Sequence, residues 1–369
     1  MRVTAVSLRD FRNYERAEID LGPGLTVVAG PNGAGKTNLL EAVYFGCVGR
    51  SPRTGNEREL LRSGATVARV SVRTEEDDGT EHLLEVGLQP GEAKSIRVDG
   101  APVDNLFATD ARPLASVFLP DRLELIKGAP ASRRAHLDQF VAAVWPARSA
   151  TRAAYSKALG QRNALLIRVR AGSSSSSSLA AWDAELARHG VRLMADRTEA
   201  VALLAGPFAA RAAQLGLPEV AELVYRPRSA ATAQDDLVGE LAERHDADLQ
   251  RGFTAHGPHR DDVRLAHDGR SLRHYGSQGQ QRVGLLALLF AERDVLAAQR
   301  GRTPLMLLDD VMSELDVARR ELLAEMLAED GQSLLSTTEV GHVPGADRDG
   351  ATVIEVAAGA ATTRSGMHA

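Results

Sequence analysis

The apolar positions of the first hundred residues follow a short period that predicts strands. Leu25–Ala29 is an apolar run that ends at Gly30, and the residues from Val3 to Leu8 also suit a strand. Asp99-Gly100 is a turn signal typical of hairpins. Further strand-like runs occur at Val67–Val72, Leu83–Leu88 and Ser95–Val98. A helical spacing of apolar residues follows Gly30, at Leu39, Leu40, Val43 and Tyr44. This part of the chain therefore predicts strands and one helix that follows a glycine-rich turn.

The apolar positions change to a helical period from Ser132 to about Asp248. A run of serines, Ser173–Ser178, separates two predicted helices, and we interpret it as a flexible connection between them. The apolar faces of these two helices carry Tyr155, Leu159, Arg162 and Leu166 in the first, and Trp182, Leu186, His189 and Leu193 in the second.

Strand signals return late in the chain, at Leu305–Leu308, Ser333–Ser336 and Val353–Val356, and we expect the tail from Ala357 to be frayed. The order of β/α, helical and again β/α segments predicts an α/β fold in which one lobe is split in sequence by an inserted, compact α-helical lobe. We place the boundaries at 1–116 and 251–369 for the two parts of the α/β lobe and at 117–250 for the helical lobe.

Composition narrows the possible classes of protein. The chain has 369 residues, of which 44% are hydrophobic and 25% charged, as in ordinary globular proteins. No run approaches the ~20 apolar residues of a membrane helix, no secretory signal is visible, and the single Cys47 excludes an intrachain disulfide. We therefore expect a cytoplasmic protein. The net charge of −5 excludes binding of nucleic acid through bulk basicity, although a local basic face remains compatible with it.

A phosphate-binding loop is the strongest motif in the sequence. Gly30-Pro31-Asn32-Gly33-Ala34-Gly35-Lys36-Thr37 matches G-x-x-x-x-G-K-[ST] in full, between an apolar strand and a helix that continues through Asn38. Glycines let backbone N–H groups turn toward phosphate oxygens, and the helix adds the positive end of its dipole. Lys36 can reach the β- and γ-phosphates, and the Thr37 hydroxyl can bind Mg²⁺. Residues 30–38 therefore predict a nucleotide site.

A second element complements the loop. Leu305–Leu308 is an apolar strand that ends in Asp309-Asp310, the pattern of a strand that carries a carboxylate to the metal beside a phosphate-binding loop. We expect Asp309 to bind Mg²⁺ and Asp310 to polarise the attacking water.

Two further segments are ambiguous by themselves. Tyr275–Arg282 precedes the apolar helix Val283–Phe290, so Ser277 and Gly279 lie at the start of a helix. Such a segment either binds an anion or only caps the helix, with no ligand. Glu314-Leu315-Asp316 is an acidic loop.

Taken in order, these segments resemble ABC-type ATPases of the SMC branch and, more closely, the RecF family of bacterial recombinational repair proteins. The similarity extends over nearly the whole chain and is diverged in the helical middle. The matching motifs are Phe11–Tyr14, Asn32–Ala42, Gly49–Thr54, Lys127–Pro130, Arg133-Arg134, Leu137-Asp138, Gly257–Asp262, Ser277–Arg282 and Leu308–Asp316.

The resemblance implies more than the residues show. RecF-like proteins bind and slowly hydrolyse ATP, dimerise on ATP, and bind single- and double-stranded DNA and its junctions in DNA repair, DNA replication and the SOS response. They act with RecR and RecO to load RecA at gaps. Carried over, Ser277, Gly279, Gln280 and Asp316 would contact the nucleotide of the partner chain, and Lys36 and Asp310 would be catalytic. Phe118–Asp121 falls in the region of the Q-loop, and Arg12 in a segment that approaches the nucleotide.

Other charged residues are open to more than one interpretation. Arg50, Arg53, Arg133 and Arg134 suit a DNA surface, or are solvated surface arginines. A local cluster of possible metal ligands consists of His256, His259, Asp261 and Asp262. Their spacing matches no defined ligand geometry, so the cluster is only a weak signal of a metal site.

Two other functions compete with a DNA repair ATPase. The ATPase subunit of a membrane ABC transporter would carry a switch histidine, a glutamate after Asp309 and a Ser-Gly-Gly-Gln signature, whereas this chain has Thr338, Asp310 and Ser277-Gln278-Gly279-Gln280. An SMC-like tether would need long coiled-coil arms, which we expect Pro146, the serine run, Pro207 and Pro218 to interrupt.

Overall fold

The computed structural model describes residues 1–217, 220–347 and 350–364. The chain forms two units, one made of Met1–Arg122, Gln214–Gly216 and Leu296–Ala369, the other of Leu123–Ala213 and Leu217–Val295. The first unit is split in sequence, as the pattern predicts. The second unit begins at Leu123 rather than at residue 117 and continues to Val295 rather than to residue 250, so it includes the segment around Ser277.

The first sheet of the first unit is antiparallel. Its strand order is β2-β1-β4-β5-β6-β7. One face is apolar because buried and exposed residues alternate along β4, and the apolar side chains point inward. The predicted Asp99-Gly100 hairpin joins β6 to β7, and both of its residues have the positive φ of a tight turn. The strands are β1 (Arg2–Phe11), β2 (Tyr14–Asp20), β4 (Ala68–Glu75), β5 (Glu81–Leu88), β6 (Ser95–Val98) and β7 (Ala101–Pro102).

The second sheet of the first unit carries the predicted apolar strands. Its order is β15-β14-β3-β13-β12-β8, and all neighbours except β14 and β15 are parallel. Parallel strands end at one edge, so the polar residues after β3, β12 and β13 come together there. The strands are β3 (Leu25–Ala29), β8 (Ala115–Phe118), β12 (Leu305–Leu308), β13 (Ser333–Thr337), β14 (Thr352–Ala357) and β15 (Ala360–Arg364).

Helix α1 (Lys36–Val48) packs between the two sheets of this unit. It is buried on nearly every side, because Leu39, Leu40 and Phe45 join one core cluster with side chains from both sheets. Gly46 permits the close approach of the first sheet, since a Cβ there would lie 2.3 Å from Cγ2 of Val72. Helix α10 (Val317–Glu329) forms the crossover between β12 and β13.

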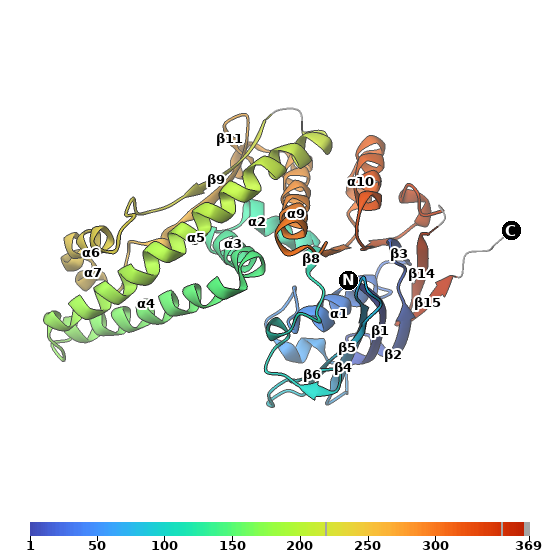
Figure 1. Ribbon diagram of the computed structural model, residues 1–369, viewed down its shortest axis with the longest axis horizontal. Helices are drawn as coiled ribbons and strands as arrows, with labels where there is room; N and C mark the ends of the chain where they lie inside the picture. Colours follow the sequence, from blue (N-terminus) through green and yellow to red (C-terminus); the bar gives the residue numbers. More distant parts are fainter. Residues whose placement is uncertain (218–219, 348–349, 365–369) are drawn as a thin grey trace. The chain divides into compact units, whose positions relative to one another are not determined.

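The second unit is mainly helical. Helices α4 (Ser149–Arg170) and α5 (Leu179–Gln214) run side by side in opposite directions, with the serine run between them (Figure 1). Leu186 and Leu193 of α5 share a buried cluster with Tyr155 of α4, so the predicted faces meet. The other helices are α2 (Glu124–Lys127), α3 (Pro130–Val144), α6 (Gln234–Glu243), α7 (His245–Arg251), α8 (Leu272–Tyr275) and α9 (Gln278–Arg300), the last residues of α5 and α9 belonging to the first unit.

Three expectations about elements are wrong. Pro207 lies inside the 36-residue α5 instead of ending it. The middle of the chain also contains strand β9 (Ala221–Arg226), which pairs with β10 (Asp262–His267), and β10 pairs in turn with β11 (Arg270–Ser271). Residues 360–364 are not frayed but form β15, which pairs with β14. Among the described helices, none has both the length and the apolar character required to cross a bilayer.

Candidate nucleotide-binding site

The phosphate-binding loop connects β3 to α1, in the context that the motif predicts. Gly35 has a φ of 120°, and a Cβ at this position would lie 2.5 Å from Nδ2 of Asn13, so only glycine fits there. Nδ2 of Asn13 donates a hydrogen bond to the carbonyl oxygen of Ala34 (2.9 Å) and the Tyr14 hydroxyl donates one to that of Gly35 (3.0 Å). The turn of the first hairpin thus supports the loop from behind.

Lys36 folds back over this loop. Its Nζ donates hydrogen bonds to the carbonyl oxygens of Gly30 (2.7 Å) and Pro31 (3.0 Å), and the residue is only 7% exposed. The ammonium group is therefore held at the loop by weak neutral acceptors, which phosphate oxygens can replace with charge-assisted hydrogen bonds.

Thr37 meets the acidic end of β12. Its Oγ1 donates a hydrogen bond to Oδ2 of Asp309 (2.7 Å). The Ser336 hydroxyl donates to Oδ1 of the same aspartate (2.6 Å) and accepts from the N–H of Asp310 (3.0 Å). Ser336 is the next-to-last residue of the neighbouring parallel strand β13, and the sequence analysis did not single it out for this role. An apolar strand that ends in Ser-Thr-Thr was the available signal.

Asp310 is strained and incompletely bonded. Its φ is 48°, which is unusual for a non-glycine residue, and its buried Oδ1 has no hydrogen-bond partner among the described residues. A buried carboxylate oxygen of this kind needs a ligand or a water molecule, which fits a site at this position.

A buried acid on α1 was missed by the sequence analysis. Glu41 is fully buried, and its carboxylate accepts two hydrogen bonds from Arg12 (both 2.8 Å), one from Arg53 (3.0 Å) and one from the Ser51 hydroxyl (2.5 Å). Burial acts to raise the pKa of Glu41, but the hydrogen bonds of Arg12 and Ser51 and the charges of Arg12 and Arg53 outweigh it and keep this pKa below its ordinary value. Arg53 also donates to Oδ1 of Asn38 (2.9 Å), so this network reaches the loop.

The segment around Ser277 begins α9 in the second unit. The Ser277 hydroxyl accepts a hydrogen bond from the N–H of Gln280 (3.2 Å), and the Gln280 side chain accepts one from the N–H of Ser277 (2.8 Å). This reciprocal capping box fixes the start of a 23-residue helix while leaving Ser277 exposed. Gly279 is in the first turn.

Asp316 begins α10 in the first unit. Its carboxylate accepts a hydrogen bond from the N–H of Arg319 (2.9 Å), so it is an N-cap, and the residue is exposed. The side chains of Pro120 and Asp121, in the expected Q-loop region, lie outside the described part of the structure.

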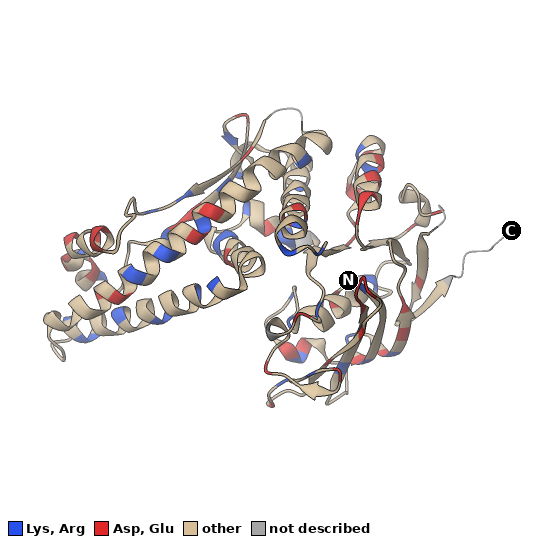
Figure 2. Cartoon of the chain, in the orientation of Figure 1, with Lys and Arg blue, Asp and Glu red and all other residues tan. Residues whose placement is uncertain are grey.

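The four arginines expected at a DNA surface lie in different environments. Arg50 is exposed and stacks over the Phe107 ring (5.5 Å), and Arg53 binds Glu41. Arg134 donates to the carbonyl oxygen of Asp261 (2.7 Å). Arg133 is 6% exposed and binds Asp262 through two hydrogen bonds (2.7 and 3.0 Å), so its burial removes it from the candidate DNA contacts. Lys and Arg positions are spread over both units, and α4 carries no acid (Figure 2).

The Gly257–Asp262 segment links the long helices of the second unit. Asp262 binds Arg133 of α3, and Asp261 binds Arg197 of α5 (3.2 Å). The Nε2 of His259 bonds the carbonyl oxygen of Thr254 (2.9 Å), so it carries the proton, and Nδ1 accepts from the Tyr155 hydroxyl of α4 (2.8 Å). These side chains bind residues of three helices, α3, α4 and α5, so the motif has a structural role that needs no metal.

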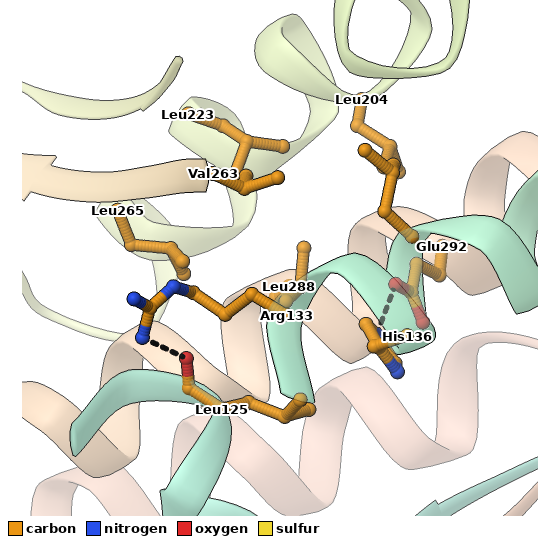
Figure 3. Close-up of a pocket in the computed structure, with 10 residues that line it drawn as sticks. Leu125, Arg133, His136, Leu204, Leu223, Val263, Leu265, Leu288 and Glu292 are labelled. Atoms are coloured by element: carbon orange, nitrogen blue, oxygen red, sulfur yellow. Dashed lines mark hydrogen bonds and ion pairs between the residues drawn. The ribbon is translucent and has the colours of Figure 1, made fainter. Parts of the chain in front are cut away.

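A cavity of about 20 Å³ lies within the second unit. Its walls are almost entirely apolar, and the ion pair of His136 with Glu292 (2.6 Å) borders it (Figure 3). The cavity can hold one water molecule and is too small for a nucleotide.

Comparisons with known proteins agree with this geometry. The family model described as RecF/RecN/SMC N terminal domain matches residues 2–358. The "DNA replication and repair protein RecF" of Anaeromyxobacter sp. (strain Fw109-5) is 39% identical over 92% of this chain and 93% of that protein. The protein of the same description from Streptomyces avermitilis is 36% identical over 94% of this chain and 95% of that protein.

Solved structures give the same result. The structure described as "recombination mediator protein RecF-ATPrS in RecFOR pathway" superposes with a TM-score of 0.88 at 27% identity, over 98% of each chain. An Smc head bound to the C-winged helix domain of ScpA superposes with a TM-score of 0.61 at 16% identity over 100% of this chain and 98% of that one, which shows a shared fold. The expected ABC/SMC-type α/β fold with an inserted helical lobe is confirmed.

Proposed function

Because the chain belongs to the RecF family within the RecF/RecN/SMC proteins, we propose that it is an ATP-controlled, DNA-binding protein of recombinational repair and replication restart. It dimerises on ATP and acts with RecR and RecO to promote RecA loading at single-strand gaps. The ATPase subunit of a membrane transporter is not favoured, because the relatives are RecF proteins over more than nine tenths of the chain.

One observation carries the nucleotide part of the proposal. The Thr37 hydroxyl and the Asp309 carboxylate, which are 272 positions apart in sequence, lie 2.7 Å from each other at the loop. Both are the hard oxygen ligands that Mg²⁺ prefers, so they would hold the ion that accompanies ATP. Bound Mg²⁺ would neutralise phosphate charge at this place.

The remaining residues of the site have distinct roles in this proposal. The backbone N–H groups of residues 30–38 and the Lys36 ammonium bind and orient the phosphates. Asp310 orients the attacking water through its unsatisfied carboxylate oxygen. Slow hydrolysis then serves as a conformational switch.

The exposed start of α9 supports action between two chains. Ser277 presents a hydroxyl and α9 presents the positive end of its dipole, a combination that suits a γ-phosphate. Each chain has one phosphate-binding loop and one such segment, so two chains form two composite sites, with Asp316 at the same interface. ADP lacks the γ-phosphate and therefore does not support the dimer.

Light scattering with ATP, with ADP and without nucleotide tests this proposal. The wild type should approach twice its monomer mass only with ATP. Ser277→Arg should bind ATP with nearly wild-type affinity and remain a monomer, since its substitution is far from Lys36 in sequence and in another unit. Gln278→Arg, at the exposed neighbouring position, is the matched charge control.

Mixing two defective variants separates action between chains from action within one chain. Lys36→Ala lacks the phosphate contact, and Ser277→Arg lacks the cap for the partner's nucleotide. A mixed dimer contains one site with both defects and one site with neither, so hydrolysis should partly recover in the mixture. If two folded variants show no recovery, the proposal of a shared site is wrong.

A further inference from the structure

A row of arginines crosses the exposed face of the antiparallel sheet in the first unit. Arg9 of β1 is directly opposite Arg16 of β2 on one side and Arg69 of β4 on the other. Paired residues of neighbouring strands point to the same face, and all three arginines are exposed while the residues next to them, Leu8 and Val70, are buried. Strands lie about 4.8 Å apart, so the backbone positions of the three arginines span only about 10 Å.

The arginine row has no acidic partner in the described part of the chain. None of the three guanidinium groups forms a hydrogen bond or an ion pair there, in contrast to Arg62, which binds Asp10 (2.8 Å) beside the row. The row continues across β5 and β6 with Gly87 and Ser95, which are small and uncharged. Glu18 and Glu85 lie in the next row of the sheet, and neither comes within ion-pair distance of the arginines.

Such a row works against folding. Like charges that are directly opposite on neighbouring strands repel each other, and Arg9 is opposed on both sides. No ion pair of the three guanidinium groups offsets this repulsion in the described part of the chain. A bound polyanion would remove the repulsion, since each guanidinium presents five N–H donors in a planar fork that matches phosphate oxygens.

We propose that the arginine row, formed by Arg9, Arg16 and Arg69, is a binding surface for the phosphate backbone of DNA. The inference rests on the proposed function, which supplies the polyanion, and adds the surface that meets it. The guanidinium groups offer only donors for phosphate oxygens, and such contacts position the duplex. They therefore bind backbone without reading sequence.

The test compares two double variants with equal loss of charge from one sheet face. Arg9→Gln/Arg69→Gln removes two members of the row. The matched control Arg73→Gln/Arg97→Gln removes two exposed arginines from other rows, where Arg97 is opposite Glu85. Binding of each protein to a labelled DNA duplex is measured by fluorescence anisotropy with ATP and Mg²⁺ between 0.05 and about 0.2 M salt.

The row variant should show a slope of log affinity against log salt that is shallower by about 2, since each lost phosphate contact releases about one counterion fewer. Its affinity at about 0.15 M salt should fall by about tenfold. The control should keep the wild-type slope. Both variants should keep wild-type ATP affinity, and the thermal midpoint of the row variant should be equal or higher because repulsion is relieved.

Four results would overturn the inference. If the row variant and the control keep the same slope as the wild type, the row does not contact DNA while the proposed function stands. If both variants lose DNA affinity equally, the affinity depends on the net charge of the protein and not on the arginine row. If the row variant binds DNA normally but loses binding to a poly-glutamate peptide, the surface serves an acidic protein. A wild type that binds no DNA at any salt overturns the proposed function as well.

Discussion

At the scale of single residues, Asp310 is the position whose role in hydrolysis can be separated from ATP binding. Asp310→Asn should retain ATP affinity within about threefold, since Lys36, Thr37 and Asp309 are unchanged, while hydrolysis should fall by about 10² or more because the water loses its orienting carboxylate. Single-turnover hydrolysis and light scattering measure the two effects, and the ATP-bound dimer should persist. Loss of ATP affinity instead would assign the metal role to Asp310.

Glu41 contributes to the acid response of the first unit. Its pKa is lowered from 4.5 in the folded protein, so its contribution to stability is fully present above pH 4.5 and is lost as the pH falls through the folded value. Glu41→Gln should cost about 3 kcal/mol at pH 7, because Arg12 and Arg53 lose their buried partner. Urea unfolding from pH 7 to 3 should show this difference shrinking in acid. A difference that stays constant would contradict the assignment, and exposed Glu59→Gln is the control.

At the scale of elements, the neutral imidazole of His259 joins α4 to the segment before β10. Burial, together with the charges of Arg260 and Arg134, lowers the pKa of His259 to about 4 from 6.5, although the hydrogen bond to Thr254 opposes this. The unfolded chain therefore takes up the proton first, and stability is fully present above pH 6.5 and is lost as the pH falls toward 4.

The lowered pKa of His259 corresponds to a loss of at most about 3 kcal/mol of folding stability in acid. His259→Gln should remove this loss between pH 6.5 and 4, so that the variant is less stable than the wild type at pH 7.5 and closer to it at pH 4.5. Urea midpoints measure the effect. The exposed His274→Gln should follow the wild type at each pH, and an unchanged pH profile for His259→Gln would refute the assignment.

At the scale of the whole molecule, net charge is a poor guide to DNA binding. The chain carries a net charge of −5, yet Arg9, Arg16 and Arg69 form a row of the first sheet that contains no acid. Affinity of the wild type for a DNA duplex should therefore fall by about tenfold or more between 0.05 and about 0.2 M salt, as counterions are released from phosphates. Anisotropy titrations measure this slope. A flat response would mean that the chain meets DNA only through a partner.

Local pattern was sufficient for the central elements of the fold. Leu25–Ala29 and Leu305–Leu308 are strands with the expected bounds, because a buried parallel strand is a continuous apolar run between turn signals. The prediction failed for β9, which is only half buried and lies in an alanine- and arginine-rich segment. It failed for Pro207 too, because packing along α5 tolerates a proline that local propensity disfavours.

The sequence by itself determined the phosphate-binding loop, the acidic end of β12 and the family resemblance, because each is a contiguous motif whose physics is local. Only the tertiary structure decided which charges are buried. Arg12 meets Glu41 across 29 positions and Arg133 meets Asp262 across 129, so neither pair leaves a local signature. The same reason explains the arginine row, since Arg9, Arg16 and Arg69 become neighbours only through strand register.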